Sequence, residues 1–117
     1  MTDQEKVYKI AEYCGAKWVR LIDAEPKRSL VMPNDPAFKL LPEADGNEKI
    51  CQIHSLPHYL SDLNAIHEAV ETVRGSERYP FYDHVLQRIM GGEFAFTSRA
   101  TAEQRANALL KTMEDNV

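Results

Sequence analysis

Four segments of the chain repeat apolar residues at the three- and four-residue spacing of an amphipathic helix. The first covers residues 3–14, and the second runs from about Pro57 to Val73. The third begins at Pro80 and stops at Gly91–Gly92, and the last carries its stripe from Ala102 to Met113. The pattern predicts helices that each bury one side. The residues expected inward on the second and third helices are Leu60, Leu63, Ile66, Val70, Val73, Phe81, Val85, Leu86 and Ile89.

Short signals mark where these helices begin and end. Thr2 with Glu5, and Thr101 with Gln104, have the spacing of a capping box, in which two side chains satisfy free backbone amides at a helix start. Pro57 suits a first helical turn, where a missing N–H costs nothing. Glycines supply the stops: Gly15, Gly75 and Gly91–Gly92.

Three shorter segments have the composition of β-strands, namely residues 17–22, 29–32 and 93–97. The first two are separated by a turn containing Pro26, so we expect them to pair as a hairpin. Residues 33–55 carry several prolines and acids without a regular pattern. This is typical of a long loop that is functional or mobile. Within it, residues 50–53 offer an alternative, a short edge strand.

These elements predict a single domain, residues 1–117, of the α+β class. Short strands cannot bury their faces alone. We therefore expect a small three- or four-stranded antiparallel sheet with the amphipathic helices packed over it, resembling an α/β/α sandwich.

Composition and charge exclude several classes of protein. The chain is 44% hydrophobic and 27% charged, with a formal net charge of −4, as in ordinary soluble domains. Negative charge argues against nucleic-acid binding as the main activity. We find no apolar run that would span a membrane and no signal-peptide pattern. We therefore expect a cytoplasmic protein whose cysteines are reduced, with Cys14 in the core.

The chain carries no strong signal for a metal, a cofactor or a catalytic centre. Cys51, His54 and His58 have a spacing that zinc ligands adopt, but structural zinc sites usually show two paired knuckles, and only one is visible. Asp62 and His67 on the second helix do not converge as an acid–base pair would. We therefore expect no metal, no cofactor and no catalytic residue, while a hydrolase of unrecognised type remains the weakest alternative.

The start of the last helix is the best candidate for an anion site. Arg99 and Arg105 flank free helix amides, and Thr101 adds a hydroxyl. The plainer interpretation is that Arg105 pairs with a surface carboxylate. Asn64, inside an apolar stretch, is expected to be a buried amide bonded to a neighbouring loop, with a ligand contact as the alternative.

Two further groups are candidates for contact with a protein partner. Asp45 and Glu48 lie in the long acidic segment, whose charge suits a basic surface. Tyr79 and Tyr82 gather with Phe81 around Pro80 and would form an aromatic patch if exposed. More often, at least one such residue belongs to the core.

Two segments resemble a known family. The segment 56–69 (LPHYLSDLNAIHEA) and the segment 100–112 (ATAEQRANALLKT) are similar to helix signatures of the phage ABA-sandwich domain family of small phage and prophage proteins. The resemblance implies helices flanking a small sheet and an accessory gene product that acts on a host pathway. Residues 33–55 and 74–92 match the family poorly, so no site residues are transferred.

Two functions are consistent with these observations. The first is a non-enzymatic phage or prophage protein that binds a host component, such as a defence system. The second is a protein, either monomeric or oligomeric, that binds or sequesters a nucleotide-type signal through Arg99, Thr101 and Arg105. The oligomeric state is left open.

Overall fold

The computed structural model describes residues 2–21, 27–50, 56–92 and 99–114. The chain divides into two compact units. The helical unit comprises Met1–Tyr13 and Pro57–Val117, and the sheet unit comprises Cys14–Leu56. Within the described ranges, no helix is long and apolar enough to cross a bilayer. The α+β class predicted from the sequence is confirmed.

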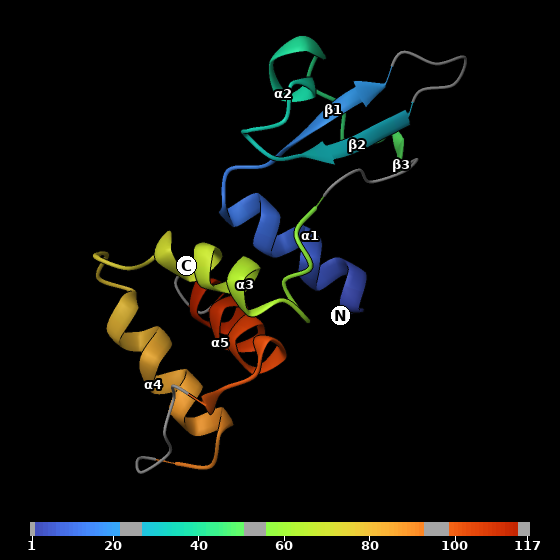
Figure 1. Cartoon of the computed structure of the whole chain (residues 1–117). Coiled ribbons are helices and arrows are strands. Elements are labelled where there is room, and N and C mark those ends of the chain that lie inside the picture. The colour runs from blue at the N-terminus through green and yellow to red at the C-terminus, as the bar shows by residue number, and fades with distance from the viewer. Residues whose placement is uncertain (1, 22–26, 51–55, 93–98, 115–117) are drawn as a thin grey trace. The chain divides into compact units, whose positions relative to one another are not determined.

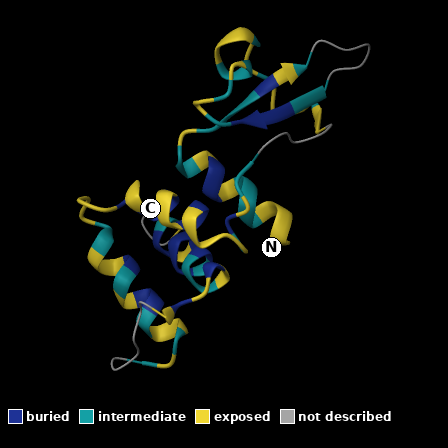
Figure 2. Ribbon diagram, in the orientation of Figure 1, coloured by how far each residue is buried: buried dark blue, intermediate teal, exposed yellow. Residues whose placement is uncertain are grey.

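The helical unit is built around its last helix. It contains α1 (Asp3–Tyr13), α3 (Leu63–Glu71), α4 (Tyr79–Ile89) and α5 (Ala102–Glu114). Contacts join α5 to each of the other three, and α1 also touches α3 (Figure 1). Figure 2 shows many buried positions on α5. These positions are Ala102, Ala106, Ala108, Leu109, Leu110 and Thr112.

The capping box predicted for α5 is confirmed, and at α1 the Thr2 half of the predicted box is present. Thr2 Oγ1 accepts the Glu5 amide at 3.2 Å. At α5, Thr101 Oγ1 accepts the Gln104 amide at 3.1 Å, while Gln104 Oε1 accepts the Thr101 amide at 2.9 Å. The local sequence therefore sets where these helices begin, because the side chains replace hydrogen bonds that the first turn lacks.

The prediction that the second helix begins at Pro57 was wrong. Asp62 caps α3, because its Oδ1 accepts the Asn64 amide at 2.9 Å and the Ala65 amide at 3.4 Å. With this start, Leu63 is 53% exposed and Asn64 is also exposed, so neither is buried as predicted. The turn that precedes α3 instead contributes Tyr59 to the core, at 2% exposure.

The sheet unit contains a hairpin and a third, very short strand. Strand β1 (Lys17–Leu21) pairs antiparallel with β2 (Lys27–Val31), and Val19 lies opposite Ser29. Strand β3 (Lys49–Ile50) pairs with β2 in the parallel direction. The described sheet is therefore mixed, and the expectation of a purely antiparallel sheet was wrong. The strand predicted at 93–97 lies outside the described residues.

The sequence predicted a loop over 33–55, and residues 33–50 form hydrogen bonds both among themselves and with the hairpin. This segment contains the short helix α2 (Ala37–Leu40). It then returns to the hairpin, where the Arg20 amide donates to the Pro42 carbonyl at 2.8 Å and the Ala44 amide donates to the Trp18 carbonyl at 3.0 Å. The same segment supplies β3 beside β2, so it contacts both edges of the hairpin.

Candidate functional site

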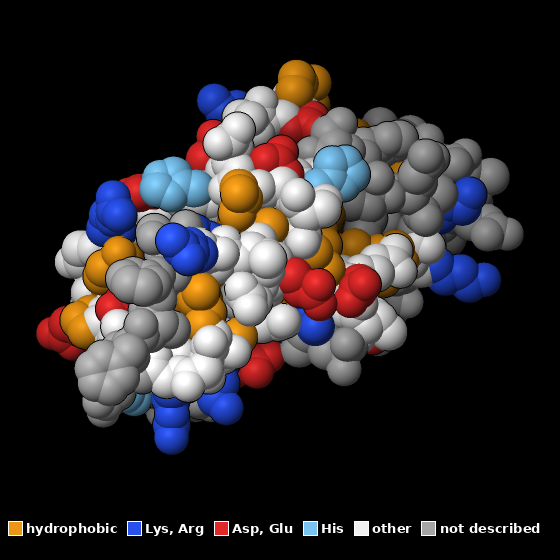
Figure 3. All heavy atoms as spheres, turned by 60° about the horizontal axis from the view of Figure 1, so that its bottom comes forward, with side chains coloured by type: hydrophobic (Ala, Val, Ile, Leu, Met, Phe, Trp, Pro, Cys, Tyr) orange, Lys and Arg blue, Asp and Glu red, His pale blue; other side chains and the backbone are white. Residues whose placement is uncertain are grey.

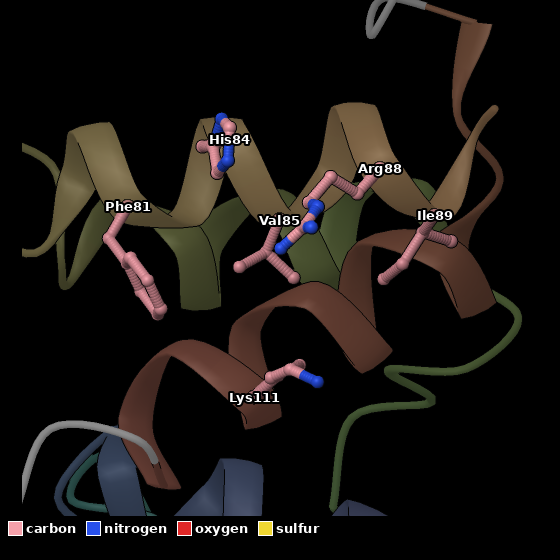
Figure 4. A pocket seen from close by; sticks show the side chains of 6 residues that line it. All are labelled: Phe81, His84, Val85, Arg88, Ile89 and Lys111. Carbon is pink, nitrogen blue, oxygen red and sulfur yellow. The ribbon is translucent and has the colours of Figure 1, made fainter. Parts of the chain in front are cut away.

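An open hollow lies between α4 and α5 in the helical unit, and we call it the α4–α5 groove. It has a volume of about 300 Å³. Its lining residues are Phe81, His84, Val85, Arg88, Ile89 and Lys111. In Figure 4, Phe81, Val85 and Ile89 extend from α4, and Lys111 comes from the neighbouring α5. The groove therefore depends on the packing of these two helices, which contact each other extensively.

The floor of the groove is apolar because three α4 residues recur at a four-residue interval. Residues four apart lie on one face of a helix. Val85 is buried at 5% exposure, whereas Phe81 is 41% and Ile89 40% exposed. The sequence predicted all three to be buried. That prediction was correct for Val85 and wrong for Phe81 and Ile89, which no described element covers fully.

Cationic side chains border this apolar floor. Arg88 lies on α4 and Lys111 on α5, so two separate helices contribute a positive charge. The His84 imidazole also lines the groove. None of the six lining residues is acidic. The nearby Asp83 side chain instead accepts a hydrogen bond from Gln87 at 3.3 Å.

Side chains of both charges occur elsewhere on the molecular surface. Figure 3 shows hydrophobic side chains reaching the surface in separate patches among Lys, Arg, His, Asp and Glu. The α4–α5 groove combines an apolar floor with the cations Arg88 and Lys111 at its border, and no acidic residue lines it.

The residues of the predicted anion site are engaged within the protein. The Thr101 hydroxyl belongs to the α5 capping box. Arg105 is partly buried, and its Nε donates to the Ala100 carbonyl at 3.1 Å. Arg99 is exposed and also has an interaction within the protein. The cap uses the hydroxyl that was expected to meet a ligand, so an anion at this helix start remains a prediction.

The acidic pair proposed for partner contact has a clear local role. Glu48 Oε1 lies 2.6 Å from Arg20 Nη2 and also accepts the Asp45 amide at 3.1 Å. We call these three residues the Glu48 clasp. The Glu48 side chain is only 6% exposed. Hydrogen bonds from Arg20 and from the Asp45 amide lower the pKa of Glu48. Glu48 is therefore engaged by Arg20 and by the Asp45 backbone, while the Asp45 side chain stays exposed.

The predicted aromatic pair divides between core and surface. Tyr82 is 3% exposed, so it does not belong to a surface patch. Burial raises its pKa to about 12. Its hydroxyl has no hydrogen-bond partner among the described residues. Tyr79 is half-buried, with the Arg74 guanidinium 5.7 Å from its ring centre.

The metal hypothesis falls largely outside the described residues, because Cys51 and His54 are among those not described. His58 is exposed. Among the residues that the structure does describe, no three His, Cys, Asp or Glu side chains are grouped so that they would hold a metal ion.

The α4–α5 groove was not predicted from the sequence, although the sequence of α4 shows an unusually wide apolar surface. Helix α4 carries two overlapping apolar sets, one at Tyr82, Val85 and Leu86, and one that adds Phe81 and Ile89. A helix with a single packing partner buries one stripe. An apolar surface wider than one stripe therefore predicts that part of the helix remains available for contact.

Comparison with known proteins gives no relative for this chain, since no family model, curated protein or solved structure matches it.

Proposed function

We propose that this protein acts by non-covalent binding of a protein partner through the α4–α5 groove. The observation that carries the proposal is the exposure of Phe81 and Ile89 on either side of Val85, beside two cations. Large apolar side chains that remain accessible in a grouped arrangement are typical of interaction sites. The apolar side chains of the groove offer contact area to a partner, and Arg88 and Lys111 offer positive charge.

The shape of the groove supports a protein partner over a small ligand. Its volume of about 300 Å³ is at the lower end of the range for small-molecule pockets. Such pockets enclose most of their ligand, whereas two of the apolar residues here remain about two-fifths exposed. A partner that covers the groove with its own surface would complete the burial.

The proposed partner is a protein of a bacterial host. The resemblance of segments 56–69 and 100–112 to small phage and prophage proteins supports a phage-encoded accessory protein. Its partner would then be a component of the host cytoplasm, and counter-defence is one such role. The second of these segments contains most of α5, which forms one wall of the groove.

The proposal is tested by recovery of the partner from bacterial cells that express the tagged protein. We expect Phe81→Glu and Ile89→Glu each to abolish recovery of a stoichiometric partner. Leu63→Glu is the matched control, because Leu63 is 53% exposed and lies on α3 outside the groove. A partner that all three variants recover equally contradicts the proposal.

The small-ligand alternative has a different outcome. Native mass spectrometry of the purified protein would show a retained molecule of low mass. If Arg99→Ala with Arg105→Ala removes that molecule while Phe81→Glu retains it, the anion site at the start of α5 is the functional surface, and the α4–α5 groove is not.

A further inference from the structure

We infer that the partner segment that occupies the α4–α5 groove is an acidic amphipathic helix. This inference rests on the proposed function and adds the chemistry of the partner. It is carried by the spacing of the apolar residues on α4, by the two helices that form the groove and by the charge at its border.

The apolar floor has the length and periodicity that a helix matches. Phe81 and Ile89 are eight residues apart on α4, so they lie about 12 Å apart along the helix axis at about 1.5 Å per residue. A second helix presents apolar side chains at the same interval on one face. Two turns of a partner helix therefore bring its side chains against Phe81, Val85 and Ile89.

An extended peptide fits this surface less well. A bound strand gains most of its affinity by pairing its backbone with the open edge of a sheet. The groove walls are helices, whose interior backbone groups already bond along the helix. A strand laid over Val85 would lose hydration from its own N–H and C=O groups without new partners. A helix satisfies those groups internally.

The border of the groove selects for negative charge. Arg88 and Lys111 line it from opposite helices, and no lining residue is acidic. A partner helix with Asp or Glu beside its apolar stripe places those carboxylates near both cations, whereas Lys or Arg at the same positions would meet like charges. The preference is therefore expected to weaken with added salt.

An anionic membrane surface is the other binding partner that an apolar and basic face can attract. Binding to anionic lipid depends on many basic residues near the surface. This chain has a formal net charge of −4, and the groove has two permanent cations. Charge therefore favours a discrete acidic helix over an anionic bilayer.

The test uses synthetic peptides with one apolar stripe and different flanking charges. Three fluorescein-labelled helical peptides carry the same leucine stripe, with Glu, Gln or Lys at the flanking positions. Affinity is measured by fluorescence anisotropy at low and high salt. We expect the Glu peptide to bind at least about tenfold more tightly than the Lys peptide, with the difference reduced at high salt.

A charge-reversal variant tests whether the groove itself is responsible. Arg88→Glu with Lys111→Glu should reverse the preference, so that the Lys peptide binds more tightly. The matched control is Lys9→Glu with Lys39→Glu, which changes the net charge equally at exposed positions of α1 and α2. This control should retain the wild-type preference. Circular dichroism and the thermal midpoint establish that each variant is folded.

Several outcomes would overturn the inference. These are equal affinity for the Glu and Lys peptides, no binding of any peptide up to about 1 mM, or loss of the preference in the Lys9 and Lys39 control. Stronger binding to phosphatidylcholine vesicles that contain phosphatidylserine than to any peptide would assign the face to membranes. If Phe81→Glu still abolishes partner recovery from cells, the proposed function stands and only the acidic helix is rejected.

Discussion

Different interactions stabilise the interior of the helical unit and the interior of the sheet unit. In the helical unit, α5 contributes buried residues that recur through most of its length, and three other helices contact it. In the sheet unit, strands of five and two residues provide few buried apolar side chains, namely Val19, Leu30 and Val31. Polar contacts there supplement the small core.

Those polar contacts gather on the hairpin and on the segment that returns to it. Glu48 joins Arg20, and the Arg28 guanidinium lies 4.4 Å from the ring centre of Trp18. Lys17 lies at the same distance from the ring centre of Phe38 on α2. Cation–π contacts and hydrogen-bonded ion pairs are individually weak at exposed positions. The comparison therefore predicts that core substitutions affect stability far more than changes to the clasp.

The largest expected effect tests the apolar core of the helical unit. Leu109 is fully buried on α5, so Leu109→Ala removes packed methyl groups and leaves a cavity. The free energy of unfolding should fall by about 2–5 kcal/mol. Urea denaturation measures the change. Leu63→Ala, at a half-exposed position of α3, is the control and should have a much smaller effect. An unchanged midpoint for Leu109→Ala would contradict the position of α5 in the core.

The next largest effect on stability is expected for a glycine of the sheet unit that has an unusual backbone conformation. Gly15 has φ of +98°, and a Cβ there would lie 3.3 Å from Pro33 Cγ. Gly15→Ala should cost about 1–2 kcal/mol, because side-chain-bearing residues disfavour this conformation. Gly46→Ala is the matched control, since a Cβ at Gly46 meets nothing within 4 Å. If both variants are equally stable by urea denaturation, the positive φ at Gly15 is not required.

A smaller effect concerns the buried hydroxyl of Tyr82. The Tyr82 hydroxyl has no partner among the described residues. Tyr82→Phe should therefore change the free energy of unfolding by no more than about 1 kcal/mol near neutral pH, because no hydrogen bond is lost. The pKa of Tyr82 is raised from 10.0 to about 12. The neutral side chain therefore favours folding below pH 10.0, and this contribution is lost as the pH rises toward 12.

Thermal midpoints across the alkaline range check this prediction. The wild-type midpoint should fall more steeply above pH 10.0 than that of Tyr82→Phe. Tyr8→Phe is the comparison variant, at a half-buried position on α1. Parallel curves for wild type and Tyr82→Phe would show that Tyr82 ionises alike in the folded and unfolded states.

The smallest expected effect belongs to the Glu48 clasp. The pKa of Glu48 is lowered from its usual 4.5 by the hydrogen bond from Arg20. The clasp therefore stabilises the folded state above pH 4.5, and its contribution is lost as the pH falls through the lower, folded-state value. Solvent screens the pair, because the Arg20 side chain is 54% exposed.

An NMR titration of the Glu48 carboxyl carbon measures this pKa directly. In Arg20→Ala the pKa should rise toward 4.5, and in wild type it should rise as salt is added. Lys39→Ala, at an exposed cation of α2, serves as the control and should leave the value unchanged. A Glu48 pKa that does not respond to Arg20→Ala would contradict the clasp.

The sequence alone determined the features that depend on neighbours in the chain. Thr2 and Thr101 correctly marked helix starts, because a capping box uses side chains within three residues. The apolar stripe of α5 correctly predicted a buried helix. The hairpin of β1 and β2 was also predicted, since strand composition and a short connection are local signals.

Only the tertiary structure decided which apolar and charged residues remain accessible. Phe81 and Ile89 share a face with Val85, so periodicity alone could not separate a covered position from two open ones. Lys111 reaches the same groove from a helix distant in sequence, and Glu48 meets Arg20 across 28 residues. Exposure and electrostatic pairing depend on packing between distant segments. The α4–α5 groove and the Glu48 clasp therefore became visible only after the helices and strands were placed within their own units.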